Sequence, residues 1–543
     1  MWHFLRRLLN GESKTVTSAA VVLAATSLAS RFVGLIRDRV LAGSFGAGSA
    51  LDTYYAAFRI PDLIYNLLVL GALSAGFIPI FTEALVRNKK SHEEAWRIAN
   101  GVLNLLVVIL IGFVVVVGIA APFITPLIAP GFSPTQLAET TILTRIMFLS
   151  PIFLGVSAVI GGILQTFRRF VVYSLGPIFY NIGIIIGAVL FVPWWGTSGL
   201  AWGVVLGAAL HMGIQLYAVR DLGYVYQWVF TVRDKFVMEI MKLMVPRMMG
   251  LAVTQINLVA MTIIASTLRT GSISVFNFAN NFQSFAVGTV GISFAIASFP
   301  LLSEAAARND RDELIKHFSH AIRQILLFIL PASVLFLLLR AQIVRSVLGS
   351  GHFDWDATIL TADTLAFFAL SLVPQAVIPL LTRSFYAYKD SVTPFVIGLF
   401  SEAMTIGFAL WLKGPLGVRG LALAYTISAT ANCILLIVTL RLKLERLDGV
   451  RILRAFYKMA AATIVMGMII QALKAPLGWL FGTRTLIGIF LQGLIPGVVG
   501  LAAYVAIGIL LKSEEIQTFV ASLHKKLFRR YAPSEGADEV VGS

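Results

Sequence analysis

Long runs of apolar residues, separated by short polar or Gly/Pro-containing breaks, follow one another along most of the chain. An α-helix needs about 20 apolar residues to cross the hydrocarbon core of a bilayer, and these runs are of that length or longer. The expected spans are 16–41, 52–86, 98–121, 138–165, 171–194, 198–219, 246–268, 272–306, 319–339, 357–385, 391–412, 416–440, 452–473 and 483–511. The pattern therefore predicts an all-α polytopic membrane protein with fourteen transmembrane helices.

Composition agrees with this class and excludes several others. Over 543 residues the chain is 58% hydrophobic and 13% charged, with a mean hydropathy of +0.86, whereas soluble domains are about 25% charged. Cys433 is the only cysteine, which excludes a disulfide framework and a cysteine metal site. No phosphate-binding glycine loop, His-Glu-x-x-His motif or nucleophile elbow is present, so we expect neither an enzyme nor a cofactor.

The positive charges report topology. Net charge is +16, but the basic residues mark the ends of apolar runs and do not form a patch with interleaved aromatics, so we expect no nucleic-acid partner. With the N-terminus inside, 31 Lys and Arg residues fall on the cytoplasmic side and nine on the other. The positive-inside rule then places both termini in the cytoplasm.

The chain carries an internal duplication. The segment 71–84 resembles 291–305, each running through a proline to a Ser/Thr-Glu-Ala helix end, and Glu83 and Glu304 are 221 positions apart. Two six-helix halves of equal orientation are predicted, a parallel-repeat arrangement that encloses a central cavity. The expected domains are a cytoplasmic amphipathic lead-in (1–15), an N-terminal lobe (16–222), a cytoplasmic amphipathic linker (223–245), a C-terminal lobe (246–441), helices 13 and 14 (442–512) and a basic amphipathic, then disordered, tail (513–543).

Charged residues inside the first two spans are the first functional candidates. Arg31 lies roughly 22 Å along the first helix, too deep for easy escape to the near interface. Asp38 follows two turns later on the same face, while Arg37 points about a third of a turn away. Asp52 and Arg59 belong to the second span. These groups either line a wet, cationic cavity or, for Arg37 and Arg59, extend to the outer interface.

Other polar groups occur singly in apolar surroundings. Glu402 lies near the middle of its span and is a candidate site for a coupling ion or proton. Arg145 is close enough to a span end to snorkel, and His211 is more typical of packing than of proton relay. Amides gather in the eighth span at positions 277, 280 and 281, where helix packing competes with cavity lining. The tail after Lys512 predicts a basic amphipathic helix on anionic inner-leaflet lipids.

Three segments of the first two spans resemble the MurJ/MviN lipid II flippases of the multidrug/oligosaccharidyl-lipid/polysaccharide exporter superfamily. They are Ser30-Arg31 with Gly34 and Arg37-Asp38, Asp52 with 54–61, and 71–74 with 77–79. The resemblance implies a bacterial inner-membrane protein that moves the undecaprenyl-diphosphate-linked peptidoglycan precursor outward by alternating access, driven by membrane potential or an ion gradient. It implies cavity roles for Ser30, Arg31, Arg37, Asp38, Asp52, Arg59 and Ser274. Asn281, one of the amides of the eighth span, is a further candidate substrate-binding residue. Cell-wall synthesis proteins are implied partners.

The chain departs from the family pattern at several positions. Tyr65-Asn66 stands where many members carry an arginine, and Asn280, Asn281 and Ser284 stand where helix 8 often has Asp-Arg and then a glutamate. The second half therefore offers amides where a cation is expected. Three alternatives stay open: flipping of another lipid-linked oligosaccharide, drug/cation antiport, and a non-transporting membrane scaffold.

Overall fold

In the computed structural model of the protein, described residues form helices and no strands. These residues are 16–70, 76–87, 92–229, 238, 252, 255–482 and 485–528. The predicted lead-in 1–15, most of the linker from residue 230 onward and the end of the tail from residue 529 lie outside them.

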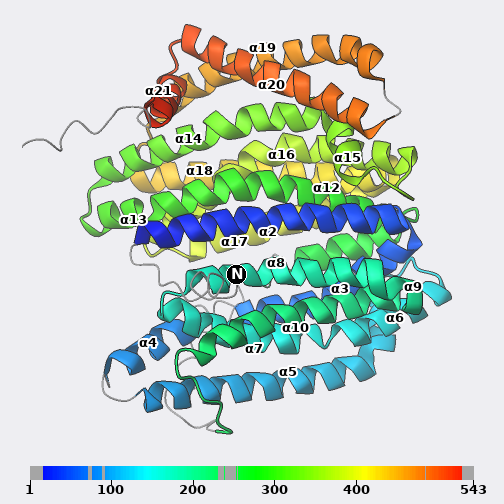
Figure 1. Cartoon of the computed structure of the whole chain (residues 1–543). Coiled ribbons are helices and arrows are strands. Elements are labelled where there is room, and N and C mark those ends of the chain that lie inside the picture. Colours follow the sequence, from blue (N-terminus) through cyan, green and yellow to red (C-terminus); the bar gives the residue numbers. More distant parts are fainter. Residues whose placement is uncertain are drawn as a thin grey trace, which may run out of the picture. The chain divides into compact units, whose positions relative to one another are not determined.

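Figure 1 labels the α-helices and colours the chain along the sequence. The helices are α2 (Val16–Phe45), α3 (Ser49–Ile64), η1 (Tyr65–Leu70), α4 (Ile78–Arg87), α5 (Glu93–Ile128), α6 (Pro134–Met147), α7 (Ser150–Thr166), α8 (Phe170–Ile186), η3 (Gly187–Phe191), α9 (Val192–Trp195), α10 (Ser198–Arg220), α12 (Ser272–Val287), η4 (Gly288–Ile292), α13 (Ser293–Ala307), α14 (Arg311–Leu338), α15 (Arg340–Leu348), α16 (Trp355–Ala387), α17 (Val392–Leu416), α18 (Val418–Leu444), α19 (Gly449–Phe481), α20 (Leu486–Leu510) and α21 (Glu514–Phe528).

The all-α polytopic fold is confirmed. Within the described residues, eleven helices are long and apolar enough to cross a membrane. The remaining predicted spans correspond to α2, to the stretch from α3 through α4, and to the shorter apolar helix Gln255–Ser266. The predicted fourteen spans are therefore compatible with the observed helices.

The chain divides into two compact units. The first comprises Met1–Phe285, Val344–Phe368 and Phe395–Ser428, and the second comprises Ala286–Ile343, Ala369–Pro394 and Ala429–Ser543. The predicted lobes, cut at residues 222 and 441, are a different division of the chain and stay a prediction.

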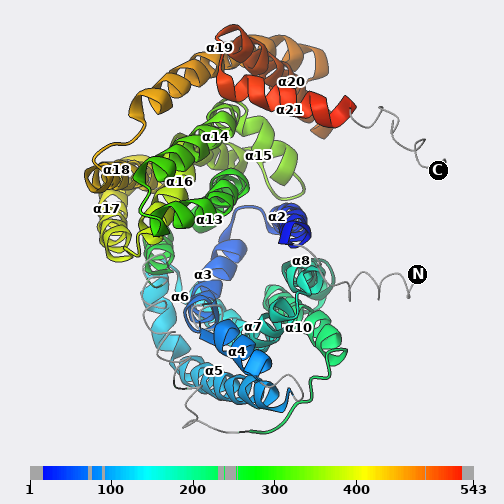
Figure 2. The ribbon, with the colours of Figure 1, turned by 90° about the vertical axis from the view of Figure 1, so that its left-hand side faces the viewer.

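In the first unit, glycines bring α8 and α10 into close contact, and α2 packs beside α8 (Figure 2). A Cβ added at Gly183 would lie 2.2 Å from the Cα of Gly207, and one at Gly187 would lie 2.4 Å from the Cα of Gly203. Small residues four apart on facing helices allow this backbone approach, which is a common way for membrane helices to associate.

In the second unit, α14, α19 and α20 pack together, and α21 docks against them. Tyr504 of α20 donates its hydroxyl to the carbonyl of Leu327 in α14 at 3.0 Å. The predicted tail helix is present as α21, and its first turn binds the protein itself, because Glu515 forms a buried ion pair with Arg323 of α14. Phe519 adds an edge contact with the ring of Phe328.

The duplication is visible in local structure. In the first half, α3 continues into the π-helical stretch η1, and α4 follows after residues 71–75, which are not described. In the second half, α12 continues into the π-helical stretch η4 and then α13. π-helical stretches are rare and often occur at functional sites, so their recurrence at corresponding positions supports the internal repeat.

Candidate substrate-binding site

The charged residues of α2 are held by specific partners. Arg37 donates from Nε and Nη2 to Oδ1 of Asp38, at 3.0 and 2.7 Å, and from Nη1 to Oδ1 of Asn181 in α8 at 3.0 Å. Asn181 is oriented by its own bond to the carbonyl of Pro177. The guanidinium is therefore fixed inside the protein and does not extend to the interface.

Asp38 connects α2 to the second half of the chain. Its side chain is almost fully buried, and its Oδ2 accepts a hydrogen bond from Nδ2 of Asn281 at 2.8 Å. Both carboxylate oxygens thus have donors, one from a cation and one from an amide. The amide at position 281, a departure from the family pattern, serves as the partner of a buried acid.

Asp52 and Ser274, both expected to line a cavity, bind each other. Oδ1 of Asp52 accepts from the backbone N–H and the hydroxyl of Ser274, at 2.8 and 2.7 Å, and Oδ2 accepts from the N–H of Gly271 at 2.6 Å. Both side chains are buried. Asp52 of α3 thus supplies the capping group at the start of α12, since Gly271 has no side chain to do so.

Glycine is required at position 271 by geometry. Its φ is +92°, and an added Cβ would lie 2.2 Å from the carbonyl oxygen of Ala47. The cap thus combines the carboxylate of Asp52 in α3 with a glycine at the position before α12.

Arg59 of α3 is bound by neutral groups. Its Nε donates to Oγ1 of Thr262 at 2.8 Å, and its Nη2 donates to Oδ1 of Asn277 at 2.5 Å. A cavity of about 170 Å³ lies beside it, lined among others by Arg37, Asn281 and Asp62. Typical ligand pockets exceed about 300 Å³, so this cavity is smaller than a ligand pocket. In this conformation the polar side chains around Arg59 bind one another.

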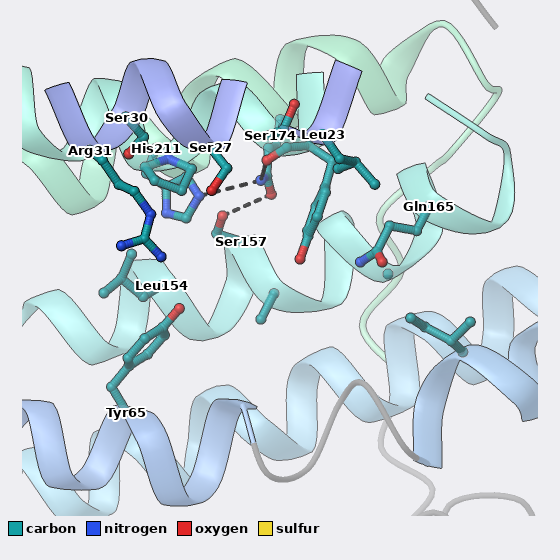
Figure 3. Close-up of a pocket in the computed structure, with 16 residues that line it drawn as sticks. Leu23, Ser27, Ser30, Arg31, Tyr65, Leu154, Ser157, Gln165, Ser174 and His211 are labelled. Carbon is teal, nitrogen blue, oxygen red and sulfur yellow. Dashed lines mark hydrogen bonds between the residues drawn. The ribbon is translucent and has the colours of Figure 1, made fainter. Parts of the chain in front are cut away.

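Arg31 lies apart from that cluster, at a larger cavity of about 480 Å³ (Figure 3). Its Nη1 donates to the backbone carbonyl of Ser284 at 3.0 Å. A guanidinium has five N–H donors, and within the described residues Arg31 makes no other hydrogen bond. Ser30 lines the same cavity, and Tyr65 faces Arg31 from the opposite side.

The rest of this cavity is rich in hydroxyl and amide groups. Ser157 donates to Oε1 of Gln215 at 2.8 Å, and Gln215 lies 3.4 Å from the ring of His211. Ser27, Ser174 and Gln165 also line it. Such groups suit a polar, hydroxylated ligand. Sequence reasoning did not assemble this set, although isolated hydroxyls and amides in apolar spans are a readable signal.

Two other cations have structural partners. Arg39 donates to the carbonyls of Ser346 and Val347, at 2.8 and 2.9 Å, at the end of α15. Arg145, which was expected to snorkel, donates to the carbonyl of Gly118 at 2.8 Å. Pro122 stands four residues after Gly118 and has no N–H for that carbonyl, so Arg145 replaces the missing helical donor.

Glu402 in α17 does not join the arginine cluster. Its Oε2 is buried and has no hydrogen-bond partner among the described residues. Nowhere in the described chain do three or more His, Cys, Asp or Glu side chains form a group suited to a metal ion. The role of Glu402 as an ion-coupling residue stays a prediction.

The fold is shared with membrane transporters. A solved structure of lipid II flippase MurJ in an inward closed conformation superposes with a TM-score of 0.75 at 23% identity, covering 92% of this chain and all of that one. An inward-facing multidrug resistance MATE family transporter of the MOP superfamily matches with a TM-score of 0.67 at 15% identity, covering 78% of this chain and 98% of that one. These likenesses show that the chain shares its fold with both solved proteins.

Sequence comparison identifies the family. The family model described as lipid II flippase MurJ matches residues 41–491, and the chain belongs to that family. A probable lipid II flippase MurJ of Rhizobium tropici is 27% identical over 96% of this chain and 98% of its own length. A probable lipid II flippase MurJ of Rickettsia prowazekii is 29% identical over 92% and 98%. The lipid II flippase MurJ of Burkholderia cenocepacia is 28% identical over 82% and 88%.

Proposed function

We propose that this chain moves lipid II from the cytoplasmic to the outer leaflet by alternating access, with Arg31, Arg37 and Arg59 receiving the diphosphate. The observation that carries the assignment of residues is that, among the described residues, Arg31 hydrogen-bonds only to a neutral acceptor, the carbonyl of Ser284. Arg59 hydrogen-bonds to a hydroxyl and an amide, and Asp62 lines the same small cavity as Arg59. An unneutralised guanidinium in a membrane helix costs at least a few kcal/mol. A diphosphate offers stronger, charge-assisted hydrogen bonds than those neutral acceptors.

The remaining candidate residues take supporting roles in this proposal. Asp38 and Asn281 fix Arg37, Ser30 lines the cavity beside Arg31, and Asp52 with Ser274 holds the start of α12 in place. The hydroxyl-rich lining near Arg31 is suited to the sugar hydroxyls of a glycosylated headgroup.

The setting of the transporter is part of the same proposal. The distribution of basic residues supports both termini in the cytoplasm of a bacterial inner membrane. Transport is driven by membrane potential or an ion gradient, with Glu402 as the candidate coupling residue. Cell-wall synthesis proteins are candidate partners.

The test is rescue of a bacterial strain depleted of its own lipid II flippase. Wild type should restore wall synthesis, and Arg31→Ala should fail at a normal membrane level of protein, with lipid II accumulating on the inner leaflet. The matched control is Arg145→Ala, which removes an arginine whose one hydrogen bond to the described residues is to a helix carbonyl, and this variant should still rescue. Failure of wild type to rescue would contradict flippase activity, and rescue by Arg31→Ala would contradict the diphosphate assignment.

A further inference from the structure

A second large cavity lies in the second unit and shares no lining residue with the cavities beside Arg31 and Arg59. It has a volume of about 1170 Å³ and is formed by the first turns of α14, the end of α18, the loop that follows it, and the start of α19. Its charged and titratable lining residues are Asp312, Lys316, His317, His320, Arg323, Arg441, Arg446, Asp448 and Arg451. Five of these are Lys or Arg and two are acids, so the lining is cationic.

Both acids of the lining already have partners. Asp312 forms an ion pair with Arg446, and Asp448 accepts a hydrogen bond from the hydroxyl of Ser319 at 2.7 Å. The Ser319–Asp448 hydrogen bond connects the loop between α18 and α19 to α14, and the Asp312–Arg446 pair adds an exposed contact. They leave neither acid available for the other cations.

Apart from Arg446, which is paired with Asp312, the cations divide into two groups. Arg323 and Arg451 face acids of α21, at 3.8 and 3.7 Å from Oε2 of Glu514, and Arg323 also binds Glu515. By contrast, Lys316 and Arg441 make no hydrogen bond or ion pair with any described residue. These two cations come from different helices and line one cavity.

Apolar side chains adjoin the cations. Val450 and Leu453 line the cavity and are 74% and 53% exposed. Tyr457 and Ile464, one and three turns further along α19, are 64% and 63% exposed and continue the same face. The positive cavity thus opens onto an apolar strip of a membrane helix. A free phosphate has no apolar group to pack against this strip, whereas the acyl chains of a lipid can pack there.

We propose that this cavity binds the headgroup of an anionic phospholipid, with its phosphate between Lys316 and Arg441 and its acyl chains along the exposed face of α19. Basic pockets between membrane helices at the cytoplasmic side are suited to acidic lipid headgroups. The site is separate from the proposed lipid II site and does not depend on the transport assignment. Under this proposal, the second unit binds a membrane phospholipid at this cavity.

The test measures lipid binding to the purified full-length chain in a neutral detergent. Dioleoyl-phosphatidylglycerol is titrated and bound lipid is counted by native mass spectrometry, with dioleoyl-phosphatidylcholine as the neutral counterpart and glycerol 3-phosphate as the soluble one. The variant is Lys316→Gln with Arg441→Gln. The control is Arg220→Gln with Arg454→Gln, which removes two exposed arginines that do not line the cavity.

We expect phosphatidylglycerol to bind wild type and the control pair alike, and the Lys316/Arg441 pair at least fivefold more weakly. A single basic residue near an anionic bilayer contributes about that factor. Unchanged binding by the Lys316/Arg441 pair, or equal binding of phosphatidylcholine, would overturn the proposal. Competition by glycerol 3-phosphate at the affinity of the lipid would overturn it in favour of a soluble phosphate. Circular dichroism and size-exclusion profiles establish that each variant is folded.

Discussion

Asp52 and Ser274 are 222 positions apart in sequence, yet the carboxylate of Asp52 accepts both the backbone N–H and the hydroxyl of Ser274. The first half of the chain thereby caps a helix that belongs to the second half. Because both side chains are buried, water has little access to replace either partner.

Removal of this cap should destabilise the protein. Asp52→Ala leaves the N–H groups of Gly271 and Ser274 buried without acceptors, and a buried unsatisfied group costs about 1–3 kcal/mol. We expect a lower Tm in detergent and a smaller effect for Ser274→Ala, which loses only the hydroxyl bond. Asp356→Ala, at an exposed aspartate, should leave Tm unchanged. Equal Tm values for Asp52→Ala and Asp356→Ala would show that the cap is unimportant.

Arg59 should be sensitive to its geometry as well as its charge. Arg59→Lys keeps one positive charge but loses the planar fork that binds phosphate oxygens in pairs. We expect flipping to fall by at least about tenfold, since a hydrogen bond to a charged group is worth about 1.5–3 kcal/mol. Thr262→Val removes one of the two neutral acceptors of Arg59, leaves Asn277 in place, and should retain near-normal flipping. If Thr262→Val lost more flipping activity than Arg59→Lys, the Arg59–Thr262 hydrogen bond would matter more than the planar guanidinium.

Asn281 should tolerate no negative charge. Its Nδ2 donates to Asp38 at 2.8 Å, so Asn281→Asp would set two carboxylates against each other and release Arg37 from its fixed position. We expect loss of rescue in the depletion strain at normal protein level. The neighbouring Asn280→Asp, at a position with no hydrogen bond to another described residue, is the control and should rescue. Rescue by both variants would argue against the Asp38–Asn281 contact in the functional cycle.

Adding a single methyl group at the contact between α8 and α10 should destabilise the protein. In Gly207→Ala the new Cβ would lie 2.4 Å from the carbonyl oxygen of Tyr180, which forces the helices apart. Overpacking typically costs about 1–3 kcal/mol, so Tm should fall. Gly213→Ala, on the same helix with open space around it, should not lower Tm and is the control. An unchanged Tm for Gly207→Ala would contradict the close packing.

The buried pair of Arg323 and Glu515 should stabilise the docking of α21. Side-chain exposure is 10% for Arg323 and 5% for Glu515, so Glu515→Gln leaves a cation with a weakened partner. The cost should be about 1–3 kcal/mol, less than the about 3–5 kcal/mol for a fully buried pair, because Glu514 stays 3.8 Å away. Limited proteolysis of α21 and Tm report this loss. Asp312→Asn, in an exposed pair, should have little effect.

The same pair gives a pH dependence. Burial raises the pKa of Glu515, but hydrogen bonds from its own backbone N–H, from Arg323 and from Ser513 outweigh burial and hold the pKa below its usual value. A lowered pKa adds stability above the unfolded value, about 4.3 for glutamate, and this stability is lost as pH falls through the folded value. The Tm difference between wild type and Glu515→Gln should therefore shrink below about pH 4. A difference that persists at lower pH would show that packing dominates.

The positions of the membrane helices could be predicted from the sequence, because the thickness of the bilayer sets the length of the apolar runs. The depth of Arg31 followed from the same arithmetic, and the structure places this residue at a cavity. The hydrogen-bond partners of the charged side chains could not be predicted from the sequence. Asp38 shares a helix face with Arg31 by periodicity, yet its donors are Arg37 and Asn281, because tertiary packing decides which side chains meet.

Some signals were present in the sequence without being assembled. Gly183 and Gly187 on one span, and Gly203 and Gly207 on the next, have the four-residue spacing of closely packed helices. Arg145 could be paired with Gly118 only after the fold was known, because the missing donor at Pro122 identifies an open carbonyl but not the side chain that reaches it.

The cap supplied by Asp52 restricts how this duplicated chain can be recombined. A chimera that joins residues before the linker of one relative to residues after the linker of another would inherit the acid from one parent and its two N–H donors from the other. Only parents with a glycine and a small hydroxyl residue matching positions 271 and 274 would supply a complete junction. The two halves are therefore not interchangeable, and each constrains the substitutions that the other can accept.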